Sequence, residues 1–265
     1  MSSRLLIKGK PGREIASVTP EATVLDYVGF IAYRLQPGET ITFERADREA
    51  CLVVLSGKAR IEADLLDFGE IGTRTSVFED KAPDAVYAPH GCRLTATASS
   101  DCEIAVAHSP GCVTRPARVI PGTSMRRSKR GEGTNQRFVT DILPADEAAD
   151  SLLVVEVVTP SSHSSSYPPH KHDSDALPEE SALEETYYHR VYPSQGYVLQ
   201  RVYTDDRSLD ETIAAENHDV VLVPRGYHPV TVPHGYTSYY LNVMAWPKRR
   251  WAFRNDPAHE WMLKV

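Results

Sequence analysis

Residues 166–173 of the chain read Ser-Tyr-Pro-Pro-His-Lys-His-Asp. His170 and His172 are one residue apart, and successive side chains of an extended strand point to opposite faces, so the two imidazoles share a face. Imidazole is a common ligand of divalent metal ions. The stretch therefore predicts a metal site on a β scaffold, with the remaining ligands further along the chain.

Glutamates follow this pair after a polar stretch, 173–181, which we expect to be an inserted loop. If a strand begins at Glu185, this side chain shares a face with Tyr187, whereas Glu184 points away. We therefore prefer Glu185 as the carboxylate ligand over Glu184 and over the two glutamates within the loop.

A third histidine, His228, ends the run Val-Pro-Arg-Gly-Tyr-His at positions 223–228. Alone it would read as a hydrogen-bonded loop residue. Together with the His-x-His pair and a carboxylate it completes a mononuclear site of three nitrogen ligands and one oxygen ligand. The predicted metal ligands are His170, His172, Glu185 and His228.

Short runs rich in Val, Ile, Leu and Tyr, separated by turn formers, recur along the whole chain. In the first half we predict strands at 28–35, 50–55, 58–63, 85–88, 93–98 and 103–108. In the second half we predict strands at 152–159, 185–191, 197–203, 220–223 and 239–245. Helical periodicity is scarce, so the predicted fold class is all-β, as a sandwich or barrel.

The two halves echo each other weakly. A Pro-x-Gly pattern follows a predicted strand at 89–91 and again at 224–226, which aligns Arg93 with His228. Because the first half has no His-x-His pair, we expect metal chemistry only in the second. The predicted division is a degenerate barrel at 1–115, a connecting segment at 116–146 and a metal-binding barrel at 147–265.

The composition is that of an ordinary globular protein, with 41% hydrophobic and 25% charged residues. A net charge of −7 argues against a nucleic-acid partner, and no apolar run reaches the ~20 residues needed to span a membrane. The four cysteines lack metal-ligand spacing and are expected to be reduced, buried thiols. Without a signal-peptide pattern, we expect a cytoplasmic protein; a homo-oligomer is left open.

The order His-x-His, Glu and Pro-x-Gly-x-His resembles the cupin superfamily, whose jelly-roll barrels hold one metal ion. Longer motifs resemble the 5-deoxy-glucuronate isomerases of myo-inositol catabolism. They are Ser-Ser-Tyr-Pro-Pro-His-Lys-His-Asp at 165–173, Glu-Ser-Ala-Leu-Glu-Glu-Thr-Tyr-Tyr-His-Arg at 180–190, and the segments 200–211, 223–230, 239–245, 255–261, 130–135 and 76–79. The resemblance covers almost the whole chain. It departs at 161–164, Ser-Ser-His-Ser, where a Gly and a Trp would be expected.

This resemblance implies a bicupin, with two jelly-roll-like β-barrels packed together. It also implies an aldose–ketose isomerase that converts 5-deoxy-D-glucuronate into 5-dehydro-2-deoxy-D-gluconate with one divalent metal ion per chain. Zinc, manganese and iron all suit such ligands. The metal would act as a Lewis acid on a cis-enediolate, and a positioned side chain would transfer the proton; a hydride shift is the alternative. The candidates for proton transfer are Glu184, Lys171, Tyr187 and Tyr227.

The substrate carboxylate requires a cation. Arg201 is the first choice, because an inward-facing arginine on a barrel strand is costly without an anionic partner. Tyr203, on the same strand face, and Tyr167, beside the histidine pair, complete the predicted substrate site. The basic cluster at 126–130 is expected to be a solvated loop or a contact with a neighbouring subunit.

Two other functions fit three histidines and one glutamate. A cupin dioxygenase would use Fe(II) and consume oxygen, whereas a non-enzymatic sugar-binding cupin would bind its ligand without turnover. The identity of the metal and oxygen uptake would separate these alternatives from an isomerase.

Overall fold

The computed structural model describes residues 3–113 and 115–264, and strands make up most of its regular elements. The N-terminal half consists of β2 (Glu14–Val18), β3 (Gly29–Leu35), β4 (Thr40–Phe43), β5 (Arg48–Ser56), β6 (Ala59–Ala63), β7 (Leu66–Ile71), β8 (Asp84–Ala88), β9 (Leu94–Ala98), β10 (Cys102–Pro110) and β11 (Arg118–Ile120).

The C-terminal half consists of β1 (Leu6–Ile7), β12 (Arg126–Arg130), β13 (Arg137–Leu143), β14 (Leu152–Thr159), β15 (Ser164–Ser165), β16 (His170–Lys171), β17 (Glu184–Tyr192), β18 (Tyr197–Tyr203), β19 (Asp210–Glu216), β20 (Val220–Val223), β21 (Val230–Thr231), β22 (Thr237–Ala245) and β23 (Arg254–Asn255). The short 3-10 helices are η1 (Pro20–Ala22), η2 (Gly122–Ser124), η3 (Gly133–Asn135) and η4 (Pro257–Lys264). None of the helices in the described part of the chain is long and apolar enough to cross a membrane.

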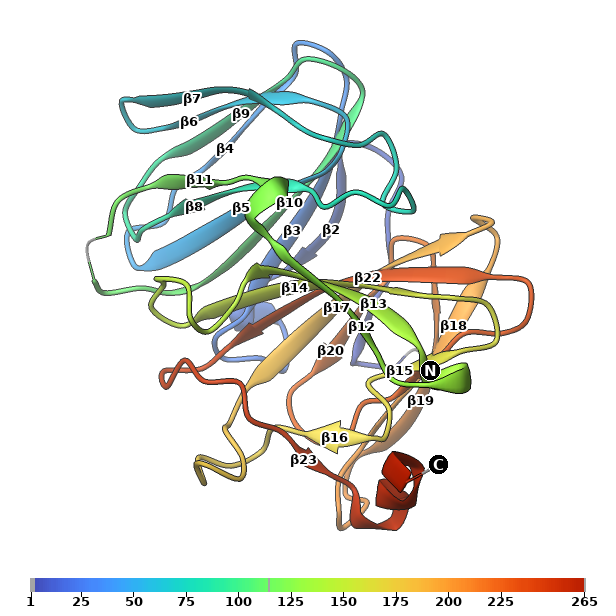
Figure 1. Cartoon of the computed structure of the whole chain (residues 1–265). Helices are drawn as coiled ribbons and strands as arrows, with labels where there is room; N and C mark the ends of the chain where they lie inside the picture. The colour runs from blue at the N-terminus through green and yellow to red at the C-terminus, as the bar shows by residue number, and fades with distance from the viewer. Residues whose placement is uncertain (1–2, 114, 265) are drawn as a thin grey trace.

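The N-terminal half is built of two sheets and the C-terminal half of three, each half around its own interior (Figure 1). In the N-terminal half, a six-stranded sheet of order β11-β8-β5-β10-β3-β2 faces a four-stranded sheet of order β4-β9-β6-β7. In the C-terminal half, a seven-stranded sheet of order β1-β20-β17-β22-β14-β13-β12 accompanies the four-stranded sheet β15-β21-β18-β19 and the pair β16-β23. The two large sheets pack against each other through one shared hydrophobic core.

Strand β5 is buried on both faces, as its unbroken run of apolar residues indicates. Leu52 and Val54 face the interior of their own half, whereas Cys51 and Val53 face the C-terminal half. A strand that is buried on both faces needs apolar residues at successive positions, so strict alternation is lost.

Strands cross the predicted domain boundaries. β1 pairs antiparallel with β20, so that Leu6 lies opposite Val221, and thus the first strand of the chain belongs to the C-terminal sheet. The segment 116–146 is divided: β11 joins the N-terminal sheet, and β12 and β13 form a hairpin at the edge of the C-terminal sheet. The three-part division at 115 and 146 stays a prediction.

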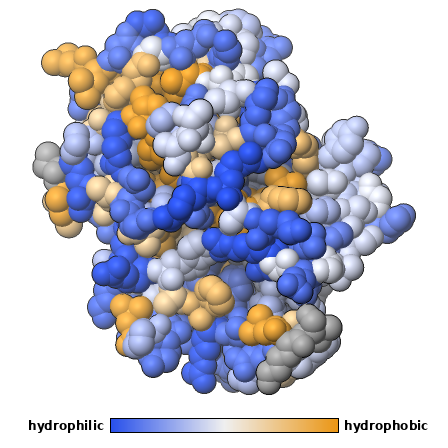
Figure 2. Space-filling model, in the orientation of Figure 1, coloured by the Kyte–Doolittle hydropathy of each residue, from blue (hydrophilic) through white to orange (hydrophobic). Residues whose placement is uncertain are grey.

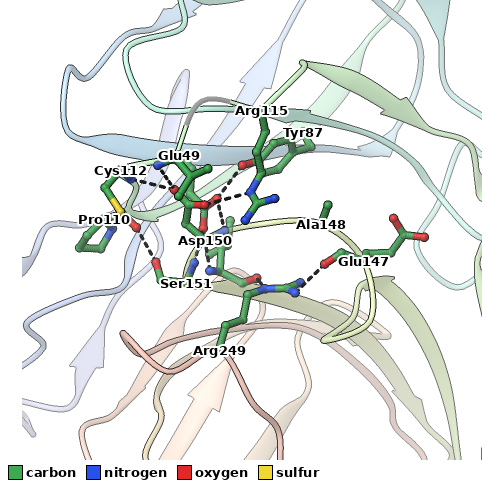
Figure 3. Close-up of polar contacts among 12 residues, drawn as sticks. Glu49, Tyr87, Pro110, Cys112, Arg115, Glu147, Ala148, Asp150, Ser151 and Arg249 are labelled. Carbon is green, nitrogen blue, oxygen red and sulfur yellow. Dashed lines mark hydrogen bonds and ion pairs between the residues drawn. The ribbon is translucent and has the colours of Figure 1, made fainter.

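A buried glutamate of the N-terminal half holds the start of β14. Glu49 on β5 accepts hydrogen bonds from the backbone N–H groups of Asp150, Ser151 and Leu152 (Figure 3). The Tyr87 hydroxyl donates a fourth hydrogen bond, of 2.8 Å, to the same carboxylate.

Glu184 on β17 makes the reverse connection. Its carboxylate accepts hydrogen bonds from the backbone N–H groups of Asp26, Tyr27 and Val28, immediately before β3. One strand of each half, β3 and β14, is therefore held at its start by a carboxylate of the other half. We call Glu49 and Glu184 the reciprocal carboxylates. Backbone N–H groups donating to an ionised carboxylate form strong hydrogen bonds.

The predicted all-β fold with two related halves is confirmed, although the sheets of each half stay separate and do not close into one continuous barrel. All the predicted strands are present within a few residues. The Pro-x-Gly echo is structural: Gly91 and Gly226 both have positive φ, at 72° and 91°. A Cβ at Gly226 would lie 2.5 Å from the Tyr203 carbonyl oxygen, so this turn requires glycine.

Candidate metal centre

Separate elements of the C-terminal half bring the predicted ligands to its interior. His170 lies on β16, and His172 follows directly, while pairing of β16 with β23 holds this edge in place. Glu185 lies on β17 opposite Val223 of β20, and the turn through Gly226 returns His228 to the same interior.

The three imidazoles form one cluster. One ring nitrogen from each of His170, His172 and His228 lies within 4.8 Å of the others. Glu185 Oε1 lies 3.4 Å from His172 Nε2 and 3.6 Å from His228 Nε2. This is the only group of three or more His, Cys, Asp or Glu side chains with such geometry in residues 3–113 and 115–264.

Backbone carbonyl groups orient all three rings. His228 Nδ1 lies 2.9 Å from the Gly226 oxygen, His172 Nδ1 lies 3.2 Å from the Ala252 oxygen, and His170 Nδ1 lies 3.4 Å from the Pro168 oxygen. With the proton on Nδ1, each ring donates a hydrogen bond to its carbonyl oxygen. The lone pair on Nε2 is then free to bind a metal ion. Such contacts fix the tautomer and ring orientation of metal-binding histidines.

Glu185 is oriented in the same way. Asn242 on β22 donates a hydrogen bond of 2.8 Å from Nδ2 to Glu185 Oε2, and Glu185 Oε1 has no hydrogen-bond partner among the described residues. His228 Nε2 also has none. Buried polar atoms without partners are rare in proteins. Converging lone pairs therefore fit a cation, and this donor set fits a divalent metal ion.

The protonation of the ring nitrogens supports this fit. Burial holds the pKa of His170 well below its ordinary value, and the neighbouring imidazoles His228 and His172 add to the effect. Burial also lowers the pKa of His172, although Glu185 acts in the opposite direction. Neutral imidazoles keep the lone pairs that a metal ion needs.

The cluster borders a small cavity that opens beside a larger one. The small cavity, of ≈ 40 Å³, has room for about three water molecules at ~10–15 Å³ each. It is lined by His170, His172 and Glu185 together with Tyr187, Ser166 and Tyr240. The outer cavity has ≈ 1110 Å³ and is bounded partly by η4. The residues that line both cavities are Arg130, Arg137, His170 and Trp251.

Two further predicted site residues lie in these cavities. Tyr187 lines the small cavity, with its hydroxyl 3.3 Å from Ser166 Oγ, and Tyr167 lines the outer cavity. Burial and the charge of Glu185 hold the pKa of Tyr187 well above its ordinary value. Tyr187 is thus a neutral phenol at physiological pH.

The structure does not bring Glu184 to the histidines. It is one of the reciprocal carboxylates, and its oxygens are occupied by backbone N–H groups of Asp26–Val28 on the opposite face of β17. Burial raises its pKa, but those N–H groups stabilise the ionised form. Saturation of its acceptors, and its absence from the lining of the small cavity, argue against a proton-transfer role.

Lys171, Tyr227 and Tyr203 form a second group outside the small cavity. Lys171 pairs with Asp205, Tyr227 donates a hydrogen bond of 2.8 Å to the same carboxylate, and the Tyr203 ring lies 5.0 Å from that of Tyr227. Because Lys171 lies between two histidines that face inward, its own side chain points away. None of the three lines either of the two cavities.

Arg201 also departs from its predicted place. Its side chain is 43% exposed and forms two hydrogen bonds of 2.7 Å with Asp210 on the neighbouring strand β19. The strand face that Arg201 shares with Leu199 is the outer one, so the guanidinium is directed to solvent and already has a carboxylate partner.

Four residues that line the small cavity were not predicted as site residues from the sequence: Asn242, Tyr240, Arg130 and Arg137. A polar Asn242 within the apolar run of β22 was the available signal for an inward-facing ligand support. Arg130 belongs to the basic cluster at 126–130, which forms strand β12 and not the expected solvated loop. Arg137 carried no local signal, because its place opposite Arg130 and beside the cavity follows only from the pairing of β12 with β13.

Comparisons with known proteins show the family of the chain. A model of the KduI/IolB family matches residues 5–262. The chain is 52% identical over 265 residues to a 5-deoxy-glucuronate isomerase from Geobacillus kaustophilus, covering 99% of this chain and 96% of that protein. A crystal structure of an IolB-like protein from Salmonella typhimurium LT2 superposes with a TM-score of 0.96 at 46% identity, covering 98% of this chain and all of the other.

A more distant likeness concerns the fold alone. A mutant of oxalate decarboxylase from Bacillus subtilis superposes with a TM-score of 0.66 at 12% identity, over 96% of this chain and 80% of the other.

Proposed function

The chain belongs to the KduI/IolB family, and on this premise we propose that it isomerises 5-deoxy-D-glucuronate to 5-dehydro-2-deoxy-D-gluconate. The observation that carries the proposal is 52% identity, over 99% of the chain, to a protein named for this activity. The same identity shows that the chain is an isomerase, and the proposed reaction is that of an aldose–ketose isomerase. A cytoplasmic location and a homo-oligomer stay predictions.

We propose that His170, His172, Glu185 and His228 hold one divalent metal ion. The proposal is supported by the converging Nε2 atoms, by the unpartnered Glu185 Oε1 and by the carbonyl groups that fix the rings. When bound, the metal would supply Lewis-acid stabilisation of the oxygen charge that develops during the reaction. Zinc, manganese and iron remain candidates.

Tyr187 is our candidate for the proton step, since it alone of the four predicted residues lines the small cavity. Isomerisation removes a proton from the hydroxyl-bearing carbon next to the aldehyde and returns one to the former aldehyde carbon. A phenol that keeps its proton does not itself take the carbon-bound proton, but it can donate a hydrogen bond to the substrate oxygen whose charge develops as that proton moves. Ser166, 3.3 Å from the phenol oxygen, would orient it.

The decisive experiment is proton NMR of 5-deoxy-D-glucuronate incubated with the purified protein in deuterated water, paired with metal analysis before and after chelation. We expect the aldehyde signal to disappear, about one metal ion per chain, loss of turnover on chelation and recovery when metal is returned. Deuterium at the former aldehyde carbon of the product supports proton transfer, whereas its absence supports a hydride shift.

Two outcomes would contradict the proposal. A metal-loaded protein without turnover would overturn the substrate assignment, and oxygen uptake would then test a dioxygenase. Full turnover by a metal-free protein would overturn the role of the four ligands.

A further inference from the structure

A pair of arginines lies over the entrance to the small cavity. Arg130 on β12 and Arg137 on β13 are directly opposite in the antiparallel register of the hairpin, so their side chains share a face. Both line the small cavity, and both also line the outer one. Figure 2 shows a hydrophilic band across the middle of the drawn face, where Figure 1 places β12.

This arrangement is unfavourable without an anion. Like charges directly opposite on neighbouring strands repel each other. Arg137 is half-buried, and no carboxylate lies within 4.0 Å of it in the described parts of the chain. The only hydrogen bond of its guanidinium to the described residues is 3.1 Å long, from Nη1 to the Asn135 carbonyl oxygen. Burial lowers the pKa of Arg137, and Arg130 adds to that effect.

The exposed arginines of the same hairpin differ. Arg126 pairs with Asp146 and Asp141, and Arg127 pairs with Asp80. Arg130 is intermediate, with its guanidinium 3.6 Å from Asp141 and its Cζ 5.3 Å from the centre of the Trp251 ring. Arg137 therefore retains the largest unused capacity to bind an anion.

The local backbone preserves space for this guanidinium. Gly131, at the turn of the hairpin, has φ of 74°, and a Cβ there would lie 2.7 Å from Arg137 Nη1. A planar guanidinium presents two parallel N–H groups that match the two oxygens of a carboxylate.

Cavity size limits how much of a bound sugar acid can enter the small cavity. The small cavity, with room for about three water molecules, accommodates one end of a six-carbon chain only. The other end must lie where the two cavities meet, and the two arginines lie at that junction.

We propose that Arg137, assisted by Arg130, binds the substrate carboxylate at the junction of the two cavities and so directs the aldehyde end toward the histidine cluster. This inference rests on the proposed isomerase function for the identity of the acid. It replaces Arg201, whose guanidinium is committed to Asp210.

The test compares Arg137→Gln with wild type on two substrates, 5-deoxy-D-glucuronate and its uncharged carboxamide. For the acid, we expect KM to rise about 10–100-fold, because the variant loses one charge-assisted hydrogen-bonded pair. The value of kcat should change much less. For the carboxamide, wild type and variant should have similar KM. Arg137→Lys keeps the positive charge but not the two parallel N–H groups of the guanidinium, so its KM for the acid should lie between those of wild type and Arg137→Gln.

Arg126→Gln, on the outer part of the same hairpin, is the matched control and should keep the wild-type KM. An unchanged KM of Arg137→Gln for the acid would overturn the inference, as would equal losses on acid and carboxamide. Thermal unfolding of each variant distinguishes loss of binding from loss of fold.

A binding measurement separates this inference from the proposed function. The acid whose aldehyde has been reduced to an alcohol cannot isomerise, so its binding can be measured by calorimetry whether or not turnover occurs. Weaker binding to Arg137→Gln than to wild type supports the carboxylate site even if wild type fails to turn over the sugar. Equal binding overturns the carboxylate site even if wild type is a fully active isomerase.

Discussion

The interiors of the two halves differ far more than their backbones do. Leu52, Val54, Ile104 and Val106 fill the N-terminal interior, together with other apolar side chains. The corresponding space in the C-terminal half holds three imidazoles, a carboxylate and an amide. The same paired-sheet scaffold therefore supports either a packed apolar core or a cluster of converging polar groups, and the inward-facing residues decide which.

One histidine of the N-terminal half illustrates the contrast. His108 shares the inner face of β10 with Val106, but its Nδ1 accepts a hydrogen bond of 2.6 Å from Arg48 Nε. Its ring also occupies the position where a Cβ on Gly29 would lie. Burial lowers the pKa of His108 to about 3, and Arg48 adds to the effect. A lone neutral imidazole with a cationic partner is a packing residue, whereas three that converge offer a cation site.

The largest expected effect distinguishes the two halves directly. His228→Ala removes one converging nitrogen atom, and we expect loss of bound metal and a fall in turnover on the order of 10³-fold, because Lewis-acid stabilisation contributes several kcal/mol. Metal analysis and proton NMR measure the two losses.

Arg93→Ala, at the matching position of the N-terminal half, is the control. Its side chain is 62% exposed, so the free energy of unfolding should change by no more than about 0.5 kcal/mol. Metal loss in the Arg93 variant would contradict the assignment of the metal chemistry to one half.

The next effect concerns a feature that the halves share. Glu49→Ala and Glu184→Ala each leave three consecutive backbone N–H groups without their acceptor, and we expect each to lower the free energy of unfolding by about 3 kcal/mol. Urea unfolding measures both. A Glu184 variant with wild-type stability but no turnover would instead favour the proton-transfer role that the structure argues against.

A third prediction tests how the halves are joined at low pH. Glu103 on β10 accepts a hydrogen bond from Tyr188 and pairs with Arg190, both on β17. Burial acts to raise the pKa of Glu103, but His218, Arg190 and Tyr188 outweigh it and lower this pKa to about 2. The folded pKa lies below the unfolded value of about 4.3, so the stabilisation is present above pH ~4.3 and is lost as the pH falls toward 2.

Glu103→Gln should therefore lose up to a few kcal/mol at pH 7 and show a flatter decline of stability below pH ~4.3. Thermal unfolding of wild type and variant across pH 2–7 measures this. Parallel stability curves for the two proteins would contradict the assignment.

The smallest expected effect sharpens the difference between the two interiors. Asn242→Ala removes the N–H donor to Glu185 Oε2, and we expect metal affinity to fall about 10–100-fold with little change of fold. Competition with a chelator measures the affinity. An unchanged affinity would show that Glu185 needs no support from β22.

Local sequence signals predicted the strands well, because strands depend on short-range periodicity. The predicted histidines do come together, and binding of a metal ion there stays a prediction. The preference for Glu185 over Glu184 followed from the period of two, and the structure places these side chains on opposite faces of β17. The Pro-x-Gly turns were recognisable because a positive φ favours glycine.

Roles that depend on distant partners were not predictable in this way. Glu184 and Glu49 acquire theirs from backbone N–H groups more than 100 residues away. Arg201 was predicted to face the interior because the sequence does not show which face of β18 is buried. Its partner Asp210 lies beside it only because β18 pairs with β19. Arg137 was overlooked because its lack of an acidic partner is a property of the folded chain.

The pairing of β1 with β20 has a consequence for the order of assembly. Leu6 is synthesised early but pairs with Val221. At a rate of synthesis of about 5–20 residues per second, Val221 is added roughly 10–40 s after Leu6. Such sequence-distant pairing slows folding, since a long loop must close before the contact forms. The reciprocal carboxylates have the same effect, because the starts of β3 and β14 each need an acceptor from the other half. We therefore expect the two halves to reach their final state together, late in synthesis, rather than one after the other.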